Sequence, residues 1–193
     1  MREGQHWRPM PAIISSVPTS RLGRQLSEVT AALNAVGAAF ALIGGLALAS
    51  YKVVRATQDV DFLADSGSAD AIEAELVKLG YRCLHRDADA ANYVRGDERL
   101  DLLYARRPIA RRLLADARAR DTSLGSLRVI SAEGLIGFKL QAFVNDAQRT
   151  QDMEDIRALL RANRETLDIA QIREYFRLFE REALLDDLLR ETG

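Results

Sequence analysis

A pair of glycines and an Asp-x-Asp pair constrain this chain more than any other feature of its sequence. Ile43-Gly44-Gly45 ends an apolar run, and Asp59-Val60-Asp61 opens another one after a short linking segment. In a strand, residues i and i+2 point to the same face, so Asp59 and Asp61 stand side by side with Cα atoms about 6.5–7 Å apart. Two parallel carboxylates repel each other unless water at a surface, or a divalent cation in a cleft, lies between them.

The apolar patterning predicts an α+β fold, a small mixed β-sheet flanked by helices with a C-terminal helical bundle. Period-two and continuous apolar runs predict strands at 38–43, 59–64, 81–85, 92–95, 99–104 and 127–130. Apolar residues at helical spacing predict helices at 20–36, 46–53, 69–79, 108–119, 132–144, 152–162, 169–179 and 182–191. Ser20 is placed to cap the first of these helices and Gly37 to end it.

Composition shifts predict three regions. Residues 1–19 hold three of the four prolines and read as an irregular leader, with 12–17 placed against the body of the protein. Residues 20–130 form an α/β core of alternating strands and helices, and residues 131–193 form a C-terminal helical region. With 193 residues, the chain is long enough for one domain with a small helical addition.

Charge and cysteine content exclude several classes of protein. The net charge of −1 gives no overall basic field of the kind that marks many nucleic-acid binders. Cys83 falls in a strand that we predict to be buried. It is the single cysteine, which excludes a disulfide framework and predicts a cytoplasmic protein. No apolar run reaches membrane-spanning length, so we expect no membrane partner.

A third aspartate strengthens the case for a metal site. Asp101 interrupts an otherwise apolar strand, and it would meet Asp59 and Asp61 if that strand lay about 4.8 Å from theirs. Three hard oxygen donors suit Mg²⁺ or Mn²⁺. Two such ions about 3.5–4 Å apart can hold the attacking and leaving oxygens of an in-line phosphoryl displacement. A solvated edge strand is the competing explanation for the Asp-x-Asp pair alone.

These motifs together resemble the nucleotidyltransferase superfamily with the DNA-polymerase-β-like fold, with 20–130 as its α/β core. The form Arg55-Ala56-Thr57-Gln58-Asp59-Val60-Asp61 is similar to the AbiEii/AbiGii abortive-infection toxin branch. That branch also carries a downstream lysine helix and an Arg-x-x-Asp-x-x-Asp segment, which match Lys139 and 149–155 here. The resemblance spans about residues 40–160. The chain departs from many members, which have Gly-Ser where Gly44-Gly45 stands.

The resemblance implies a role for each matching residue. Gly44 and Gly45 would hold the triphosphate of a nucleotide through backbone N–H groups. Asp59, Asp61 and Asp101 would ligate the metal, and Asp101 would also act as general base toward the acceptor hydroxyl. Lys139 would reach a triphosphate oxygen, and Asp152 would orient Lys139 or the acceptor. Arg55 and Thr57, just before the acidic strand, are placed to bind phosphate.

Each of these residues also has a structural explanation. The two glycines fit a tight strand–helix turn, and Arg55 and Thr57 could cap the segment before the acidic strand. Lys139 could extend its ammonium to water from an apolar helix, and Asp152 could be the N-cap of the next helix. Six arginines form a basic stretch that fits either a solvated face or contact with RNA phosphates: Arg106, Arg107, Arg111, Arg112, Arg118 and Arg120.

The sequence therefore predicts a Mg²⁺- or Mn²⁺-dependent enzyme that moves an NMP group from an NTP to an acceptor hydroxyl and releases pyrophosphate. The AbiEii resemblance implies the toxin-like member of a toxin–antitoxin or phage-defence system, with RNA (tRNA) or protein as acceptor and a cognate antitoxin as partner. Two alternatives stay open. One is an antibiotic-modifying nucleotidyltransferase, and the other is a non-catalytic module that binds a nucleotide or a partner protein.

Overall fold

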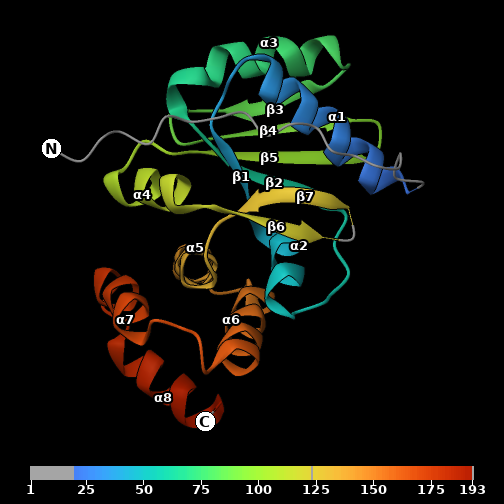
Figure 1. The fold of residues 1–193 in the computed structure, drawn as a ribbon. Helices are drawn as coiled ribbons and strands as arrows, with labels where there is room; N and C mark the ends of the chain where they lie inside the picture. The colour runs from blue at the N-terminus through green and yellow to red at the C-terminus, as the bar shows by residue number, and fades with distance from the viewer. Residues whose placement is uncertain (1–19, 123, 193) are drawn as a thin grey trace, which may run out of the picture.

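A seven-stranded mixed sheet forms the centre of the molecule (Figure 1), which is seen in a computed structural model that describes residues 20–122 and 124–192. Along the sheet the strands follow the order β3-β4-β5-β2-β1-β7-β6. Their bounds are β1 Phe40–Leu42, β2 Asp59–Ala64, β3 Arg82–Arg86, β4 Ala90–Arg95, β5 Glu98–Tyr104, β6 Arg118–Thr122 and β7 Gly125–Val129. The predicted leader at 1–19 lies outside the described residues.

Helices cover the sheet and extend beyond it. Their bounds are α1 Arg21–Ala35, α2 Gly44–Leu48, α3 Ala69–Lys78, α4 Pro108–Asp116, α5 Ala132–Asn145, α6 Thr150–Asn163, α7 Ile169–Leu178 and α8 Glu182–Thr192. Two short 3₁₀ turns, η1 Ala49–Tyr51 and η2 Ser66–Ser68, follow α2 and β2. In Figure 1, α1 and α3 lie by the part of the sheet that holds β3, β4 and β5, while α6, α7 and α8 gather at the opposite end of the molecule. This arrangement is the predicted α+β fold.

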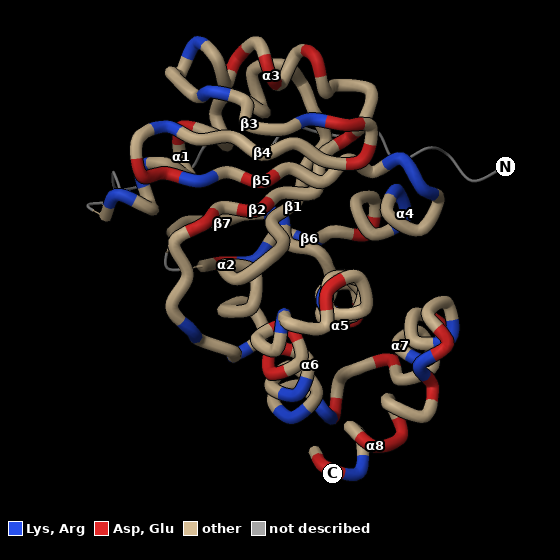
Figure 2. Tube along the Cα trace, turned by 180° about the vertical axis from the view of Figure 1, so that it is seen from behind, with Lys and Arg blue, Asp and Glu red and all other residues tan. Residues whose placement is uncertain are grey.

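The pairing of the central strands decides which side chains meet. β2 runs parallel to β5 in a register that sets Asp59 opposite Arg99 and Asp61 opposite Asp101. β1 pairs antiparallel with β2, and β4 pairs antiparallel with β5. The prediction that the two acidic strands, β2 and β5, are neighbours is thereby confirmed. Figure 2 shows acidic positions on β2 and β5, in the middle of the sheet, and basic positions on α4.

One continuous apolar core joins the sheet to the C-terminal helices. It includes Val60 and Phe62 of β2, Leu102 of β5, and Leu135 and Leu140 of α5, all nearly free of solvent contact. Burial at roughly 25 cal/mol per Å² of apolar surface makes such a cluster the main stabilising term. The helices after residue 131 are thus anchored to the same core as the sheet that precedes them.

The structure corrects several details of the predicted elements. The helix predicted at 108–119 ends at Asp116, and Arg118–Thr122 instead forms β6, which pairs with β7. This strand escaped prediction because three of its five residues are charged and nearly all of it is exposed, as an edge strand allows. The helix expected at 46–53 begins at Gly44 as α2 and continues into η1. Cys83 lies on the edge strand β3 and is only partly buried, so its predicted buried strand is wrong.

The predicted helix boundaries of α1 are confirmed at both ends. The Ser20 hydroxyl accepts a hydrogen bond from the backbone N–H of Gly23 at 3.0 Å, which is the N-cap geometry. Gly37 has a φ of +68°, the left-handed conformation that a glycine adopts just after a helix. No helix among the described residues has the length and apolar character needed to cross a membrane.

Candidate active site

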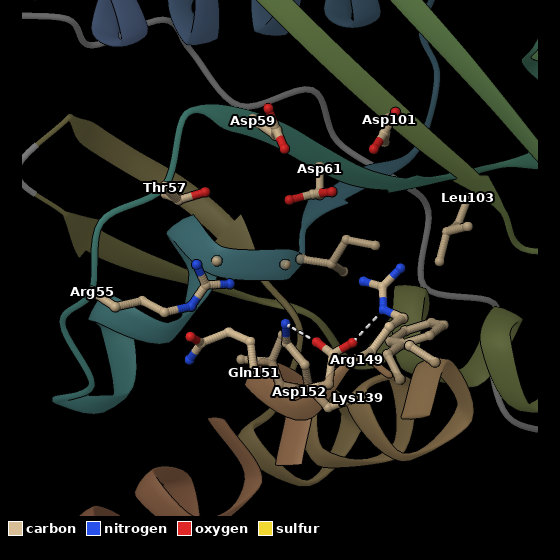
Figure 3. Close-up of a pocket in the computed structure, with 16 residues that line it drawn as sticks. Arg55, Thr57, Asp59, Asp61, Asp101, Leu103, Lys139, Arg149, Gln151 and Asp152 are labelled. Carbon is tan, nitrogen blue, oxygen red and sulfur yellow. Dashed lines mark hydrogen bonds and ion pairs between the residues drawn. The ribbon is translucent and has the colours of Figure 1, made fainter. Parts of the chain in front are cut away.

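Three carboxylates share one wall of a cleft, which we call the aspartate wall. Asp59 and Asp61 project from the same side of β2, and Asp101 projects from the neighbouring position on β5 (Figure 3). Asn92 of β4 donates from Nδ2 to Asp101 Oδ1 at 2.7 Å, which fixes that carboxylate from behind. Within the described part of the chain, no ion pair joins any of the three aspartates to a basic side chain. The aspartate wall therefore carries negative charge without a directly bonded counter-ion from these residues.

The surroundings of Asp61 shift its pKa. Burial raises the pKa of Asp61 to about 6, and the nearby charges of Asp101 and Asp59 add to that rise. The charge of Lys139 and a hydrogen bond from the backbone of Gly45 act in the opposite direction but do not offset it. A carboxylate with a raised pKa in a cleft is typical of functional sites.

The two glycines bring the backbone against this wall. Gly44 has a φ of +65°, and a Cβ there would overlap the Asp61 carboxylate. At Gly45 a Cβ would lie 2.9 Å from Thr57 Oγ1 and 3.0 Å from a terminal nitrogen of Arg55. Gly44 therefore requires glycine, whereas a side chain at position 45 would have to displace the side chain of Thr57 or Arg55. A serine at position 45 would compete with Thr57 for the same space, which fits Gly-Gly here in place of Gly-Ser.

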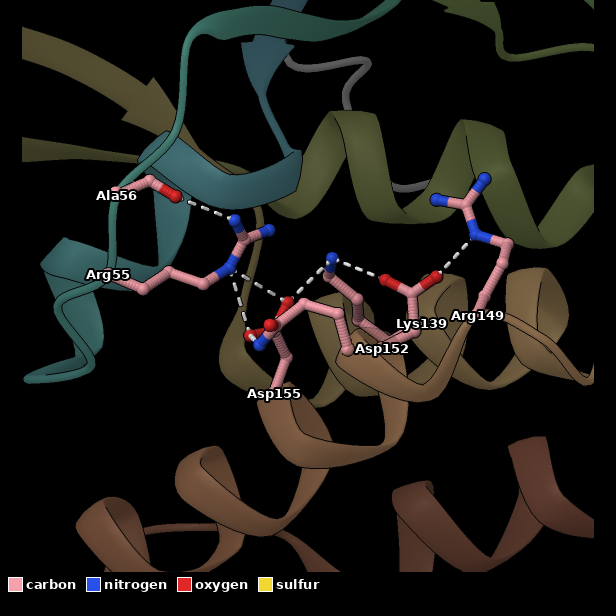
Figure 4. A network of polar contacts seen from close by, with 7 residues as sticks. Arg55, Ala56, Lys139, Arg149, Asp152 and Asp155 are labelled. Carbon is pink, nitrogen blue, oxygen red and sulfur yellow. Dashed lines mark hydrogen bonds and ion pairs between the residues drawn. The ribbon is translucent and has the colours of Figure 1, made fainter.

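A network of buried ion pairs forms the facing wall (Figure 4). Lys139 Nζ of α5 lies 2.6 Å from Asp152 Oδ1 and 2.8 Å from Asp155 Oδ2, both on α6. Arg55 Nε donates to Asp155 Oδ1 at 3.0 Å, and Arg149 Nε donates to Asp152 Oδ2 at 2.6 Å. The three cations and two carboxylates leave this wall with a net positive charge, opposite in sign to the aspartate wall.

The network decides between explanations that the sequence left open. Lys139 is 8% exposed, so it does not extend its ammonium to water. Asp152 lies inside α6, whose N-cap position is Arg149, so the N-cap explanation for Asp152 is wrong. Burial acts to raise the pKa of Asp152, but hydrogen bonds from Lys139 and Arg149 outweigh it and lower that pKa below its ordinary value. Asp152 is therefore held ionised against Lys139.

The two walls enclose a cleft of about 430 Å³. Every predicted site residue lines it: Gly44, Gly45, Arg55, Thr57, Asp59, Asp61, Asp101, Lys139 and Asp152. Sequence reasoning missed Arg149 and Gln151, which also line the cleft, and Asp155, which ties Arg55 and Lys139 together behind it. The Arg-x-x-Asp-x-x-Asp spacing was the signal available for Arg149 and Asp155.

A second depression, which we call the side hollow, continues from the cleft. It has a volume of about 290 Å³ and shares Leu103, Phe138, Ala142 and Arg149 with the cleft. Its remaining lining residues are Gln141, Asn145 and Asp146 at the C-terminal end of α5. The six arginines of the basic stretch, all described, line neither the cleft nor the side hollow. Arg120 lies over the Tyr51 ring, 5.1 Å from its centroid, and Arg106 is 4.0 Å from Asp89.

The aspartate wall fits a divalent cation in chemistry, although not as a set of three ligands in its present arrangement. Carboxylate oxygens are the ligands that Mg²⁺ and Mn²⁺ prefer, and no basic side chain of the described residues pairs with them here. As the side chains stand, no group of three or more His, Cys, Asp or Glu within 20–122 and 124–192 is arranged to hold one metal ion. Mg²⁺ is commonly held by one or two carboxylates together with substrate phosphates, so fewer than three of these side chains suffice.

The fold is that of the nucleotidyltransferases. The crystal structure of ANT(2'')-Ia in complex with adenylyl-2''-tobramycin matches with a TM-score of 0.63 at 18% identity, over 83% of this chain and 98% of that one. The lincosamide antibiotic adenylyltransferase LnuA, bound to lincomycin, matches with a TM-score of 0.55 at 15% identity, over 70% of this chain and 94% of that one. An antigenic nucleotidyltransferase-like protein from Paracoccidioides brasiliensis matches with a TM-score of 0.54 at 16% identity, over 89% and 93%.

The sequence itself matches no protein-family model and no curated protein. At these identities the structural likeness establishes the fold. The function of the cleft must follow from the residues that line it.

Proposed function

We propose that this protein is a nucleotidyltransferase that moves an NMP group from an NTP to an acceptor hydroxyl. The observation that carries the proposal is the pairing of two oppositely charged walls across one cleft. One wall holds Asp59, Asp61 and Asp101, and the other holds Lys139 and Arg149. A metal–triphosphate complex presents both signs of charge, so it complements such a cleft.

Each group has a defined part in this reaction. Asp59, Asp61 and Asp101 would hold Mg²⁺ or Mn²⁺, which when bound neutralises the negative charge of the triphosphate. The Gly44-Gly45 turn gives the phosphates room to approach the backbone, and Thr57 lies beside it. Arg149 offers its remaining guanidinium N–H groups to phosphate oxygens, since its Nε is the atom that pairs with Asp152.

Asp101 is the candidate base for the acceptor. The acceptor oxygen forms a bond to the α-phosphorus of the NTP, and its proton passes to Asp101. The bond between the α-phosphorus and the bridging oxygen breaks, and pyrophosphate leaves with the electron pair. Asn92 holds Asp101 on β5 throughout, because its amide donates to one oxygen of that carboxylate. Positioning and charge would supply most of the rate enhancement, as in phosphoryl transfer generally.

The acceptor separates two versions of this function. The motif at 55–61, with Lys139 and the segment at 149–155, supports an AbiEii-like toxin that acts on RNA or protein. Two neighbours of similar fold are an ANT(2'')-Ia complex with adenylyl-2''-tobramycin and a lincosamide adenylyltransferase, which supports a small-molecule acceptor. A non-catalytic module is disfavoured, because it would have no use for three mutually repelling aspartates in one wall.

Calorimetric titration with each of the four NTPs, in Mg²⁺ and in EDTA, tests the proposal. We expect one or more NTPs to bind in Mg²⁺, and we expect binding to be lost in EDTA and in Asp61→Asn. Incubation of a cell lysate with the α-labelled form of that NTP then reports the acceptor. Label on RNA or protein supports the toxin version, and label on a small molecule supports the other. Equal NTP binding by wild type and Asp61→Asn would refute the metal site.

A further inference from the structure

The side hollow opens next to the candidate base. Leu103 follows Asp101 by two residues on β5, so both side chains stand on the same face of the sheet. Asp101 lines the cleft, and Leu103 lines both the cleft and the side hollow. A molecule that presents a hydroxyl to Asp101 can therefore extend over Leu103 to the entrance of the side hollow.

From this continuity we infer that the side hollow is the acceptor site, and that its acceptor is a small, uncharged, hydroxyl-bearing molecule with one apolar face. This inference rests on the proposed nucleotidyl transfer. A volume of about 290 Å³ lies just below the usual range for small-molecule sites, which is roughly 300–1,000 Å³. The side hollow thus has space for a compact molecule such as a nucleoside or a monosaccharide.

The lining of the side hollow selects the chemistry of that molecule. Leu103, Phe138 and Ala142 supply an apolar surface on which a sugar or base face can pack. Gln141 and Asn145 supply side-chain amides, which pair with hydroxyl groups both as donors and as acceptors. Such a set recognises neutral polar groups on one edge of a ligand and an apolar face on the other.

The side hollow does not carry the charges that a polyionic acceptor would need. Its carboxylate is Asp146 and its guanidinium is Arg149, whose Nε pairs with Asp152 outside the side hollow. Asp146 is exposed, and its Oδ1 already accepts a hydrogen bond from the backbone N–H of Gln148 at 3.0 Å. A polycationic acceptor would need several carboxylates in the side hollow itself, since those of the aspartate wall are assigned to the metal. A polyanionic one would need several cations, and the six arginines of the basic stretch line neither the cleft nor the side hollow.

The experiment compares neutral and charged acceptors. The full-length protein is incubated with Mg²⁺, the NTP that it binds in its α-labelled form, and one acceptor at a time. The neutral acceptors are adenosine, uridine and methyl glucoside, the polycation is tobramycin, and the polyanion is total tRNA. We expect label on at least one neutral acceptor and none on tobramycin or tRNA. Label on tobramycin or tRNA in preference to the neutral compounds overturns the inference, and so does bound NTP with no label on any neutral compound.

Asn145→Trp places a large side chain in the side hollow without replacing a residue that lines the cleft. We expect it to raise the KM for the neutral acceptor by about tenfold or more, while the KM for the NTP stays within about twofold of wild type. Leu178→Trp, at an exposed position on α7, is the matched control and leaves both values unchanged. An unchanged acceptor KM in a folded Asn145→Trp protein contradicts the inference.

A further double variant tests the charged alternative. Arg107→Ser combined with Arg112→Ser lowers transfer only if RNA phosphates bind α4, so a loss of transfer in that variant counts against the inference. Loss of NTP binding itself would be a failure of the proposed function, whereas normal NTP binding with the wrong acceptor would be a failure of this inference alone.

Discussion

Asp61 and Asp101 are direct partners in the parallel pairing of β2 and β5, and neither forms an ion pair with a cation of the described residues. The register that creates this pair also buries Val60 and Leu102 on the opposite face, so a one-residue slip would turn the core residues into the cleft. The apolar core therefore enforces the repulsion between the two carboxylates. Stability and function make opposite demands on these residues, and this conflict gives measurable consequences.

Removal of one charge from the aspartate wall should stabilise the metal-free protein. Asp61→Asn abolishes the carboxylate whose pKa burial raises to about 6. The shift from an ordinary value near 4 corresponds to roughly 3 kcal/mol as an upper figure. We expect urea unfolding at pH 8 in EDTA to give a higher free energy of unfolding for Asp61→Asn than for wild type, with nucleotidyl transfer lost. A lower free energy of unfolding for Asp61→Asn would show that the ionised Asp61 carboxylate does not destabilise the fold.

The pH dependence of stability follows from the same group. Because the pKa of Asp61 is raised in the folded state, the folded protein binds more protons than the unfolded chain between about pH 4 and pH 6. The contribution of Asp61 to stability is therefore favourable at the acid end of this window and is lost as pH rises through about 6. The free energy of unfolding of wild type minus that of Asp61→Asn, measured in EDTA, should fall across this window. A flat difference would contradict the raised pKa.

The contribution of Asp152 to stability should change with pH in the opposite direction to that of Asp61, and at lower pH. Its folded pKa is lowered by Lys139 and Arg149, so its stabilising contribution is present above about pH 4 and is lost as pH falls through the lowered value. The free energy of unfolding of wild type should therefore exceed that of Asp152→Asn at neutral pH, and this difference should shrink as the solution becomes more acidic. The difference is measured by urea unfolding from pH 7 downward, and a gap that widens in acid would contradict the assignment.

The buried lysine should cost much more to remove than an exposed one. Lys139→Met leaves Asp152 and Asp155 buried without the cation that they share. We expect the free energy of unfolding to fall by about 3–5 kcal/mol. Lys78→Met is the matched control, because Lys78 is paired with Glu75 on the exposed side of α3 and should cost about 0–1 kcal/mol. Thermal and urea unfolding of both variants provides the comparison. Equal losses would mean that the network is not a buried unit.

The glycine turn can be tested against a second glycine of similar backbone conformation. Gly37→Ala introduces a side chain at a φ of +68° with nothing within 4 Å, so only backbone strain of about 1–2 kcal/mol is expected. Gly44→Ala adds overlap with the Asp61 carboxylate at a φ of +65°. We expect Gly44→Ala to abolish NTP binding in titration calorimetry, whereas Gly37→Ala binds normally. Normal binding by Gly44→Ala would exclude a close approach of the phosphates to this turn.

The sequence was sufficient for the aspartate wall, because that wall follows from strand geometry. The period of two aligns Asp59 with Asp61, and the strand spacing brings Asp101 beside them once β5 is placed next to β2. The facing wall is different. Asp155 reaches Lys139 and Arg55 only because α6 docks across α5. The Arg-x-x-Asp-x-x-Asp spacing marks Asp155 as part of a motif but does not encode that docking. The edge strand β6 escaped prediction for a related reason, since its pairing with β7 and not its composition makes it a strand.

The most direct test of nucleotidyl transfer follows the two ends of the triphosphate separately. The protein is incubated with Mg²⁺ and its preferred NTP, labelled at the α-phosphate in one reaction and at the γ-phosphate in another, together with the acceptor found in the lysate. The account predicts that the acceptor takes up the α-label, that the γ-label leaves in pyrophosphate, and that Asp61→Asn does neither. A γ-label retained on the acceptor, or transfer of the α-label by Asp61→Asn at the wild-type rate, would contradict it.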